Sequence, residues 1–462
     1  MRCFLLLLVL VTSLCAQQML PDTPAGKRAA AFLEMVNSTG DDALKKFILD
    51  HVTPNPDLTL DQRVERFRGI RNDMAGAKLL NVLNADAEGI SFSLANSRGE
   101  SFRIQLELGD ESKIAGIRVN PLEGGGAQKP KAVKVPESKF LSAVEKYLAD
   151  TVKQDKFSGT VLITKGGRSV FAKAFGMASK EKKLANRIDT KYNLGSINKI
   201  FTMLAVGMLA DEGRLSLDDT IGKYLPDYPN EAARAKVTIR HLLTMTSGVG
   251  DFFGPEYEAM PKDKLRNIAD FIPLFAHKPL LFEPGKGRRY SNGGYVLLGA
   301  VIEKASGRSY YDFVRDRIFT PIGMSNTESY FSDAKTPNLA MGYTREIDAK
   351  KWSANTTTRP ARGSSAGGGY STAQDLLKFA NAIEAKTFKV PAALLSMQDP
   401  MVGGLFRGGL GFAGGAPGIN STIDSALPGG YSVVVLSNYD PPAAEAAAAH
   451  IRGLLGVKEG IG

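Results

Sequence analysis

One stretch of the chain is rich in glycine and proline and has no hydrophobic periodicity: residues 120–130, with the sequence NPLEGGGAQKP. Such a stretch is typical of a flexible connection between domains. The chain has 462 residues, which is more than one hydrophobic core usually serves. We therefore expect two domains, over residues 25–120 and 137–457, joined by a linker over residues 121–136.

The first 16 residues have the pattern of a signal peptide. Arg2 supplies a positive charge, residues 4–11 form an unbroken apolar run, and Ala16 is a small residue before the polar Gln17. The run is well short of the ~20 apolar residues that a membrane-spanning helix needs. We expect cleavage after Ala16 and export of the protein to the periplasm or the medium. A retained membrane anchor is the alternative.

Cysteine and histidine usage and the charge distribution exclude several kinds of site. Cys3 and Cys15 both lie in the signal peptide, so the mature chain has no thiol for a disulfide or a metal site. The four histidines have no metal-ligand spacing. The net charge is +10, but no basic block is interleaved with aromatic residues, so we expect no nucleic-acid binding. We expect no metal or organic cofactor, and at most a peripheral attraction to an anionic envelope surface.

A small α+β domain is predicted before the linker. Apolar residues recur with helical periodicity from Ala25 to Ile48. Apolar and polar residues then alternate, as in strands, in four stretches: residues 79–82, 90–94, 102–106 and 114–119. Turn residues at 96–99 and 109–112 separate the later strands. We expect a fold similar to cystatin or NTF2-type domains, which binds an unknown partner or supports oligomerisation.

The second domain has strand patterns at its two ends and helical patterns between them. It begins with an amphipathic helix from Phe140 and continues with a hairpin over residues 159–164 and 170–175. It ends with a strand from Tyr431 to Leu436 and an alanine-rich helix over residues 443–455. This order predicts an α+β architecture in which an antiparallel sheet is flanked by helices and accompanied by a helical subdomain.

Ser196 and Lys199 stand at the start of the most apolar helix of this domain, which continues to Leu209. The N–H groups at a helix N-terminus favour negative charge that develops there. Residues three apart lie on one face of a helix, so the amine can reach the hydroxyl, and burial would keep the amine neutral. Two other Ser-x-x-Lys matches, at residues 179–182 and 332–335, lie in charged, loop-like stretches, where the lysine stays solvated. We therefore select Ser196 as the nucleophile and Lys199 as its activating partner.

Tyr290 and Asn292 form a second candidate motif, Tyr-Ser-Asn, before an apolar helix. A tyrosine hydroxyl near Lys199 can move a proton to a leaving group, and an asparagine amide can hold both the lysine and a substrate carbonyl. A similar match at residues 228–230 contains a proline beside a charged stretch, which is typical of a surface turn. We expect Tyr290 to be catalytic and Asn292 to bind substrate.

With these motifs, residues 140–455 resemble the superfamily of class C β-lactamases, D-alanyl-D-alanine carboxypeptidases, esterases and other penicillin-binding-protein-like enzymes. Three further stretches support the resemblance: residues 238–248, 319–324 and 366–372. The resemblance implies a β-lactamase/transpeptidase-like fold and a serine hydrolase that cleaves an ester, amide or peptide through an acyl-enzyme.

The third motif of that superfamily, a Lys or His followed by a small residue and glycine, is altered here. The corresponding stretch is residues 411–418, in which Phe412 takes the basic position and Gly414 and Gly415 follow. The glycine-rich segment 403–410 before it is short, so we expect a strand, or part of one, to be missing. The resemblance places Phe412, Gly414 and Gly415 with Asn292 in the substrate site, where backbone N–H groups of Ser196 and of about Gly415 form the oxyanion hole.

Because Phe412 replaces the cation of the third motif, we expect neutral esters, amides or peptides to be better substrates than β-lactams that carry a carboxylate. We also expect the activity to be weakened. The alternative is a catalytically impaired protein that keeps the fold for binding or scaffolding.

Two other signals have ordinary explanations. Residues 363–367 fit the Gly-x-Ser-x-Gly elbow of α/β-hydrolases, but no strong strand precedes them and no helix follows directly. His241 heads an apolar helical segment and is predicted to cap or pack that helix rather than to act as a base.

Overall fold

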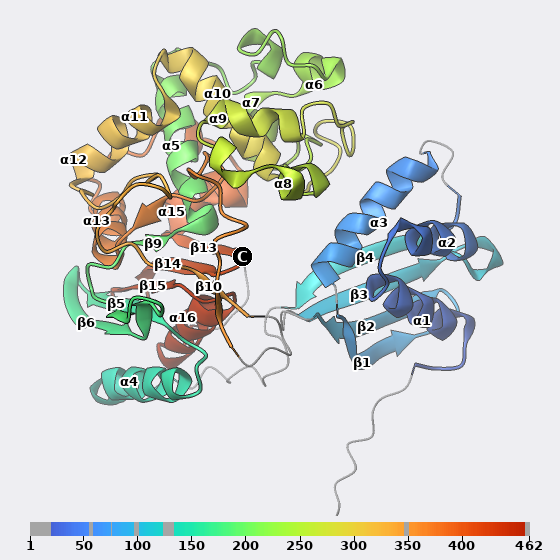
Figure 1. Cartoon of the computed structure of the whole chain (residues 1–462), viewed down its shortest axis with the longest axis horizontal. Helices are drawn as coiled ribbons and strands as arrows, with labels where there is room; N and C mark the ends of the chain where they lie inside the picture. The colour runs from blue at the N-terminus through green and yellow to red at the C-terminus, as the bar shows by residue number, and fades with distance from the viewer. Residues whose placement is uncertain are drawn as a thin grey trace, which may run out of the picture. The chain divides into compact units, whose positions relative to one another are not determined.

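The structure is a computed structural model that describes residues 20–54, 59–74, 76–96, 101–122, 134–345 and 351–457. The described residues form two compact units, residues 20–122 and residues 134–457 (Figure 1). The predicted signal peptide lies outside the described residues, as do residues 123–133 of the predicted linker. In the part of the chain that the structure describes, no helix has the length and apolar character that a membrane span needs.

The first unit packs three helices on a four-stranded antiparallel meander in the order β1-β2-β3-β4. The helices are α1 (Pro24–Val36), α2 (Asp41–His51) and α3 (Leu60–Met74), and the strands are β1 (Lys78–Ala85), β2 (Gly89–Ala95), β3 (Ser101–Leu108) and β4 (Ile114–Leu122). Phe32, Phe47 and Phe92 meet edge to face in its core. All four strands lie where the alternation predicted them, and Asp110–Ser112 form the second predicted turn. Residues 97–99 of the first turn lie outside the described residues.

Helix α3 was not predicted, because most of its residues are charged or polar. It is held by a few apolar side chains, among them Val64, Phe67 and Met74, which the rest of the unit buries. The likeness to cystatin or NTF2-type folds stays a prediction.

The second unit contains a five-stranded antiparallel sheet in the order β13-β14-β15-β5-β6. Its strands are β5 (Gly159–Lys165), β6 (Arg168–Phe175), β13 (Gly411–Ala416), β14 (Ile419–Leu427) and β15 (Tyr431–Ser437). The two ends of the domain meet in the middle of this sheet, where Val435 pairs with Val161. The predicted hairpin, terminal strand and α+β class are confirmed.

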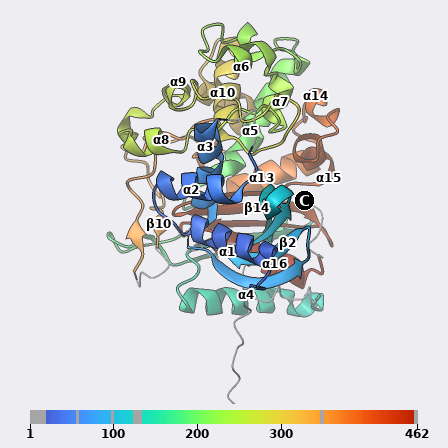
Figure 2. The same ribbon diagram turned by 90° about the vertical axis from the view of Figure 1, so that its right-hand side faces the viewer.

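Alternate residues of β15 face two different cores, as the period of a strand requires. Val433 and Val435 pack with the helices α4 (Glu137–Lys153) and α16 (Ala443–Leu454). Val434 and Leu436 face the large core on the other side. Figures 1 and 2 both show α4 and α16 on the face of the sheet away from α5 (Asn198–Asp211) and α10 (Asn292–Ser306).

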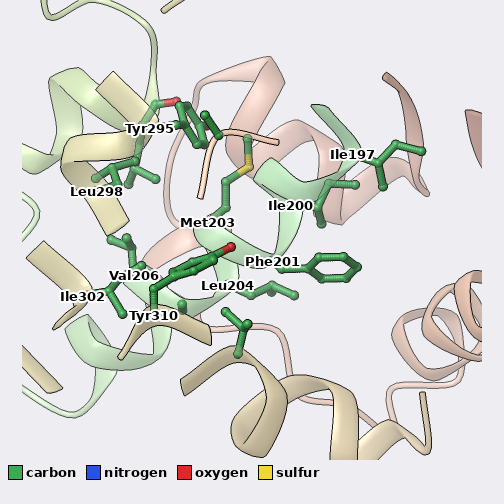
Figure 3. Close-up of a cluster of buried hydrophobic side chains, with 14 of the residues drawn as sticks. Ile197, Ile200, Phe201, Met203, Leu204, Val206, Tyr295, Leu298, Ile302 and Tyr310 are labelled. Atoms are coloured by element: carbon green, nitrogen blue, oxygen red, sulfur yellow. The ribbon is translucent and has the colours of Figure 1, made fainter. Parts of the chain in front are cut away.

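The helical subdomain is built around α5. This helix has apolar residues on all its faces after its first turn, as expected for a helix that is buried on almost every side. Figure 3 shows its Met203 and Val206 against Tyr295 and Leu298 of α10. Around this pair lie α13 (Ala373–Glu384) and shorter helices: α6 (Glu231–Lys236), α7 (Ile239–Leu243), α8 (Pro255–Ala259), α9 (Ile268–Phe271), α11 (Tyr310–Val314), α12 (Thr320–Ile322), α14 (Ala392–Leu395) and α15 (Leu405–Gly408). The second unit also contains short strands outside its five-stranded sheet: β7 (Met177–Ser179), β8 (Leu184–Ala185), β9 (Tyr192–Asn193), β10 (Tyr343–Thr344), β11 (Ser353–Ala354) and β12 (Tyr370–Ser371).

The strand that carries the third motif is complete. All six residues of β13 pair with β14, from Gly411 with Asp424 to Ala416 with Ile419. The glycine-rich segment before it forms α15, which is anchored by the buried Leu405 and Phe406. The expectation that a strand is missing here was therefore wrong.

Candidate active site

Ser196 lies in a tight turn that leads directly into α5. Gly195–Ile197 form one turn of 3-10 helix, and Gly195 has a φ of 50°, which glycine adopts without strain. The side chain of Asn193 accepts a hydrogen bond from the Gly195 N–H at 2.9 Å and so fixes the turn. The Ser196 hydroxyl is thereby held at the N-terminal end of the buried helix.

The Lys199 amine is enclosed and points at Ser196. Lys199 is 0% exposed, and its Nζ lies 3.2 Å from Ser196 Oγ and 2.7 Å from Asn292 Oδ1. It also donates a short hydrogen bond to the carbonyl oxygen of Ala366. Burial lowers the pKa of Lys199 to about 7, against the opposing effect of the Asp251 charge. Near pH 7 a large fraction of this amine is therefore neutral.

The three partners of Lys199 decide where its lone pair lies. The Asn292 side-chain oxygen and the Ala366 carbonyl can only accept, so they take the two protons of the neutral amine. The remaining direction is occupied by the Ser196 hydroxyl, which can donate. The geometry thus presents the lone pair of Lys199 to the proton of Ser196.

Tyr290 contacts the same serine oxygen. Its Oη lies 2.5 Å from Ser196 Oγ, and the Lys199 Nζ lies 4.7 Å from the centre of its ring. Tyr290 is 47% exposed, so part of its side chain is open to solvent. Burial raises the pKa of Tyr290 to about 12, although the hydrogen bond to Ser196 works in the opposite direction. The phenol is thus protonated at neutral pH and can donate to Ser196 Oγ.

Asn292 is the first residue of α10 and is held by Asp251. The N-cap of this helix is Ser291, whose Oγ accepts from the Gly294 N–H at 2.8 Å. Asp251 Oδ2 accepts from the Asn292 side-chain Nδ2 at 2.8 Å and from its backbone N–H at 3.1 Å. The side-chain oxygen of Asn292 is left facing Lys199.

The edge strand β13 runs directly against the serine turn. A Cβ at Gly414 would lie 2.1 Å from the Leu194 carbonyl oxygen and 2.7 Å from the Ser196 backbone nitrogen, so only glycine fits. A Cβ at Gly195 would lie 2.9 Å from the Gly415 nitrogen. A two-residue loop joins Ala416 to Ile419, so these two residues form the hydrogen-bonded pair that closes the hairpin. Hydrogen-bonded and non-hydrogen-bonded pairs alternate along an antiparallel ladder, so the next pair, Gly415 with Asn420, is not hydrogen-bonded. The N–H of Gly415 therefore points away from β14. The Gly415 N–H can therefore act together with that of Ser196 on a substrate oxyanion.

Phe412 stands two residues before Gly414 on the same strand. Its side chain is partly buried and packs against the large core of the unit. The position that carries a Lys or His in the resembling superfamily is therefore apolar here, and it supplies no charge to Lys199 or to a substrate.

Two groups at the site were not identified from the sequence, Asp251 and the carbonyl of Ala366. The Gly-x-Ser-x-Gly stretch is no nucleophile elbow, because its central Ser365 is 0% exposed and its hydroxyl donates to the Tyr295 carbonyl oxygen at 2.8 Å. The backbone carbonyls of this stretch bind α5 instead: Ser364 O accepts from Asn198 Nδ2, and Ala366 O accepts from Lys199. The nearest sequence signal for Asp251 was its place just after the supporting stretch 238–248.

His241 is confirmed as a capping residue. Its Nδ1 accepts from the Thr238 N–H, and the Thr238 hydroxyl accepts from the His241 N–H, which is a reciprocal cap of α7. Among the described residues, no group of three or more His, Cys, Asp or Glu side chains could hold a metal ion.

Comparisons with known proteins match the unit that holds this site. A family model described as Beta-lactamase matches residues 144–458. Penicillin-binding protein 4* of Bacillus subtilis (strain 168) is 36% identical over 202 residues, which are 43% of this chain and 44% of that protein. The chain thus spans less than half the length of this curated relative.

Solved structures share the fold of the unit. The penicillin binding protein from Bacillus halodurans is 30% identical with a TM-score of 0.58, over 66% of this chain and 99% of that chain. D-amino acid amidase from Ochrobactrum anthropi SV3, complexed with L-phenylalanine amide, is 24% identical with a TM-score of 0.59, over 69% of this chain and 98% of that chain. At this lower identity the likeness shows the fold alone.

Proposed function

The chain belongs to the beta-lactamase family, and on that premise we propose that it is a serine hydrolase that cleaves a neutral ester, amide or peptide through an acyl-enzyme. The observation that carries the proposal is the direction of the Lys199 lone pair. A buried amine with a pKa of about 7, whose protons are taken by Asn292 and Ala366, has only the Ser196 hydroxyl left to act on.

In the acylation step, Ser196 Oγ attacks the substrate carbonyl while its proton passes to Lys199 Nζ. A carbon–oxygen bond forms, and the carbonyl electron pair moves to the oxygen, where the N–H groups of Ser196 and Gly415 stabilise it. When that pair returns, the bond to the leaving group breaks. The leaving group takes its proton from Tyr290 Oη, and the Lys199 ammonium restores that proton to the phenol.

In the deacylation step, water attacks the acyl carbon and gives one proton to the neutral Lys199 amine, from which it passes to Ser196 Oγ. The bond to Ser196 Oγ then breaks, and the serine recovers its proton. Asn292, held at the N-terminus of α10, keeps the lysine in place and offers its side chain to the substrate. No step of this sequence requires a metal or an organic cofactor.

The preference for neutral substrates rests on Phe412. A Lys or His at this position would attract a substrate carboxylate, whereas the phenylalanine side chain packs into the core and adds only apolar surface. A carboxylate-bearing β-lactam therefore loses a favourable charge interaction here, and a small neutral ester does not.

The alternative function is a binding or scaffolding protein that has kept the fold and lost turnover. The absence of a cation at Phe412 favours this impaired protein. The expected loss of a strand would also have favoured it, but strand β13 is complete. A pre-steady-state measurement with a chromogenic ester separates the two. A burst of one equivalent followed by steady turnover supports the hydrolase, whereas a burst without turnover supports the impaired protein.

Export is part of the proposal and rests on the sequence of the first 16 residues. Expression in a Gram-negative host, followed by fractionation and mass spectrometry, tests it. A mature chain that begins at Gln17 in the periplasm or the medium is expected, and an uncleaved chain in the membrane fraction would support the anchor. For the first unit we propose a role in partner binding or oligomerisation, and for the chain as a whole, with its net charge of +10, a peripheral association with an anionic envelope surface.

The nucleophile is tested by labelling with a fluorophosphonate probe or a fluorescent penicillin. The wild-type protein should be labelled, and Ser196→Ala should not. Persistent labelling of Ser196→Ala would show that another residue is the nucleophile.

A further inference from the structure

Asp251 lies in the loop before α8, outside every motif that the sequence analysis singled out. Its carboxylate accepts three hydrogen bonds: from the Asn292 N–H at 3.1 Å, from Asn292 Nδ2 at 2.8 Å and from the Phe253 N–H at 3.1 Å. The first two place it at the N-terminus of α10, where the helix dipole favours a negative charge. The same residue is thus tied to the backbone and to the side chain of a site residue.

The carboxylate of Asp251 fixes the orientation of the Asn292 side-chain amide. A carboxylate only accepts, so the NH2 group of the amide must face Asp251 and the oxygen must face Lys199. With the amide reversed, its NH2 group would face the amine and donate to the lone pair of Lys199. Ser196 would then lose the acceptor for its proton, although every residue of the motifs would still be present.

The charge of Asp251 has a second effect, on the protonation of the site. It raises the pKa of Tyr290, in the same direction as burial. It also raises the pKa of Lys199, but there burial acts in the opposite direction and has the larger effect. The other groups that the structure places beside the amine are neutral: the Ser196 hydroxyl, the Asn292 amide, the Ala366 carbonyl, and the rings of Tyr290 and Tyr295 at 4.7 and 5.4 Å.

We propose that Asp251 is a positioning residue, which fixes the Asn292 amide in the one orientation that leaves the Lys199 lone pair to Ser196. Asp251 does not touch the reacting atoms. It acts through Asn292, and its role rests on the proposed function of the site.

The test compares Asp251→Asn and Asp251→Ala with the wild-type protein and with a control, Asp263→Asn. Asp263 is an exposed carboxylate a short way along the chain, so the control removes the same charge away from Asn292. Two readouts are followed against pH: kcat and KM for a neutral chromogenic ester, and the rate at which a fluorophosphonate labels Ser196. Thermal unfolding of each variant shows whether it is folded.

Asp251→Ala should lower kcat and the labelling rate by about tenfold or more at pH 7, with KM little changed, because the general base loses its orientation. Asp251→Asn keeps the shape and removes the charge, so the acidic limb of its pH profile should move to lower pH by about 0.5 to 1 unit. Asp263→Asn should behave as the wild-type protein. A merely structural role would lower the melting temperature and leave the labelling rate of the folded variants unchanged at pH values above the acidic limb.

Each failure has its own signature. If the wild-type protein turns over the ester and both Asp251 variants keep its rate within about twofold at pH values above the acidic limb, the positioning role is wrong and the proposed function stands, whether or not the limb moves. If the wild-type protein shows neither turnover nor labelling that depends on Ser196, the proposed function is wrong, and the role of Asp251 falls with it.

Discussion

The Nζ of Lys199 lies 3.2 Å from the Oγ of Ser196, and no water-exposed surface of the lysine remains to compete for this contact. Burial sets the charge of the amine, and the two carbonyl-type acceptors around it set the direction of its lone pair. The hydroxyl of Tyr290 contacts the same serine oxygen at 2.5 Å. The hydroxyl of Ser196 therefore stands between a proton acceptor and a proton donor.

Lys199→Met should abolish most of the acylation, because the buried base disappears while an apolar side chain of similar length remains. We expect the rate of Ser196 labelling to fall by about 10²–10⁴-fold. Stopped-flow or gel-based labelling measures this rate directly. A matched control is Lys182→Met, which replaces the exposed lysine of another Ser-x-x-Lys match and should leave the rate unchanged. Equal loss in both variants would contradict the role of Lys199.

Tyr290→Phe should keep the half-exposed ring and remove only the hydroxyl that contacts Ser196. We expect kcat for an ester to fall by about 10²-fold with little change in thermal stability, since proton transfer to the leaving group loses its donor. Esters with better leaving groups need that proton less, so the loss should shrink along a series of phenyl esters. A uniform loss across the series would argue against proton donation by Tyr290.

Gly414→Ala should disturb the serine turn, because the added Cβ would lie 2.1 Å from the Leu194 carbonyl oxygen and 2.7 Å from the Ser196 nitrogen. We expect a loss of about 1–3 kcal/mol in the free energy of unfolding, with a loss of activity larger than the remaining fold explains. Gly411→Ala is the control on the same strand, since its Cβ would meet nothing closer than Asp424 Oδ1 at 4.0 Å. Denaturant unfolding and ester hydrolysis are the measurements. Identical behaviour of the two variants would refute the close contact.

Phe412→Lys should return a cation to the third motif and extend the substrate range to carboxylates. We expect the acylation rate with a fluorescent penicillin to rise by about tenfold, because a charge-assisted hydrogen bond contributes about 1.5–3 kcal/mol. Phe412→Met is the neutral control of similar volume. If both variants react with the penicillin as slowly as the wild-type protein, the charge at this position does not govern substrate choice.

The motif residues could be predicted from the sequence because each has a local signature. Ser196 and Lys199 are spaced by one helical turn at the start of an apolar helix, and Tyr290 and Asn292 precede another such helix. These strands were predictable for a similar reason, since residues 159–164 and 431–436 are short runs rich in β-branched and other apolar residues, which suits strands that are buried on both faces. Local pattern and tertiary burial agree at these places.

Asp251 and the Ala366 carbonyl could not be predicted, because nothing local distinguishes them. Their importance comes from the packing of α5, α10 and two loops, which brings residues far apart in the sequence to one amine. The segment before Gly411 was misjudged for a related reason. Its glycines suggested a missing strand, whereas two buried apolar side chains, Leu405 and Phe406, hold it as a short helix.

The central claim is that Lys199 is a neutral base for Ser196 near pH 7, and the pH dependence of Ser196 labelling by a fluorophosphonate tests it most directly. The labelling rate should rise about tenfold per pH unit at acidic pH, bend at the pKa of Lys199, about 7, and stay level above it, because the amine accepts the serine proton only when it is deprotonated. A bend near the ordinary lysine value of about 10.4, or a rate that does not change with pH, would contradict the account.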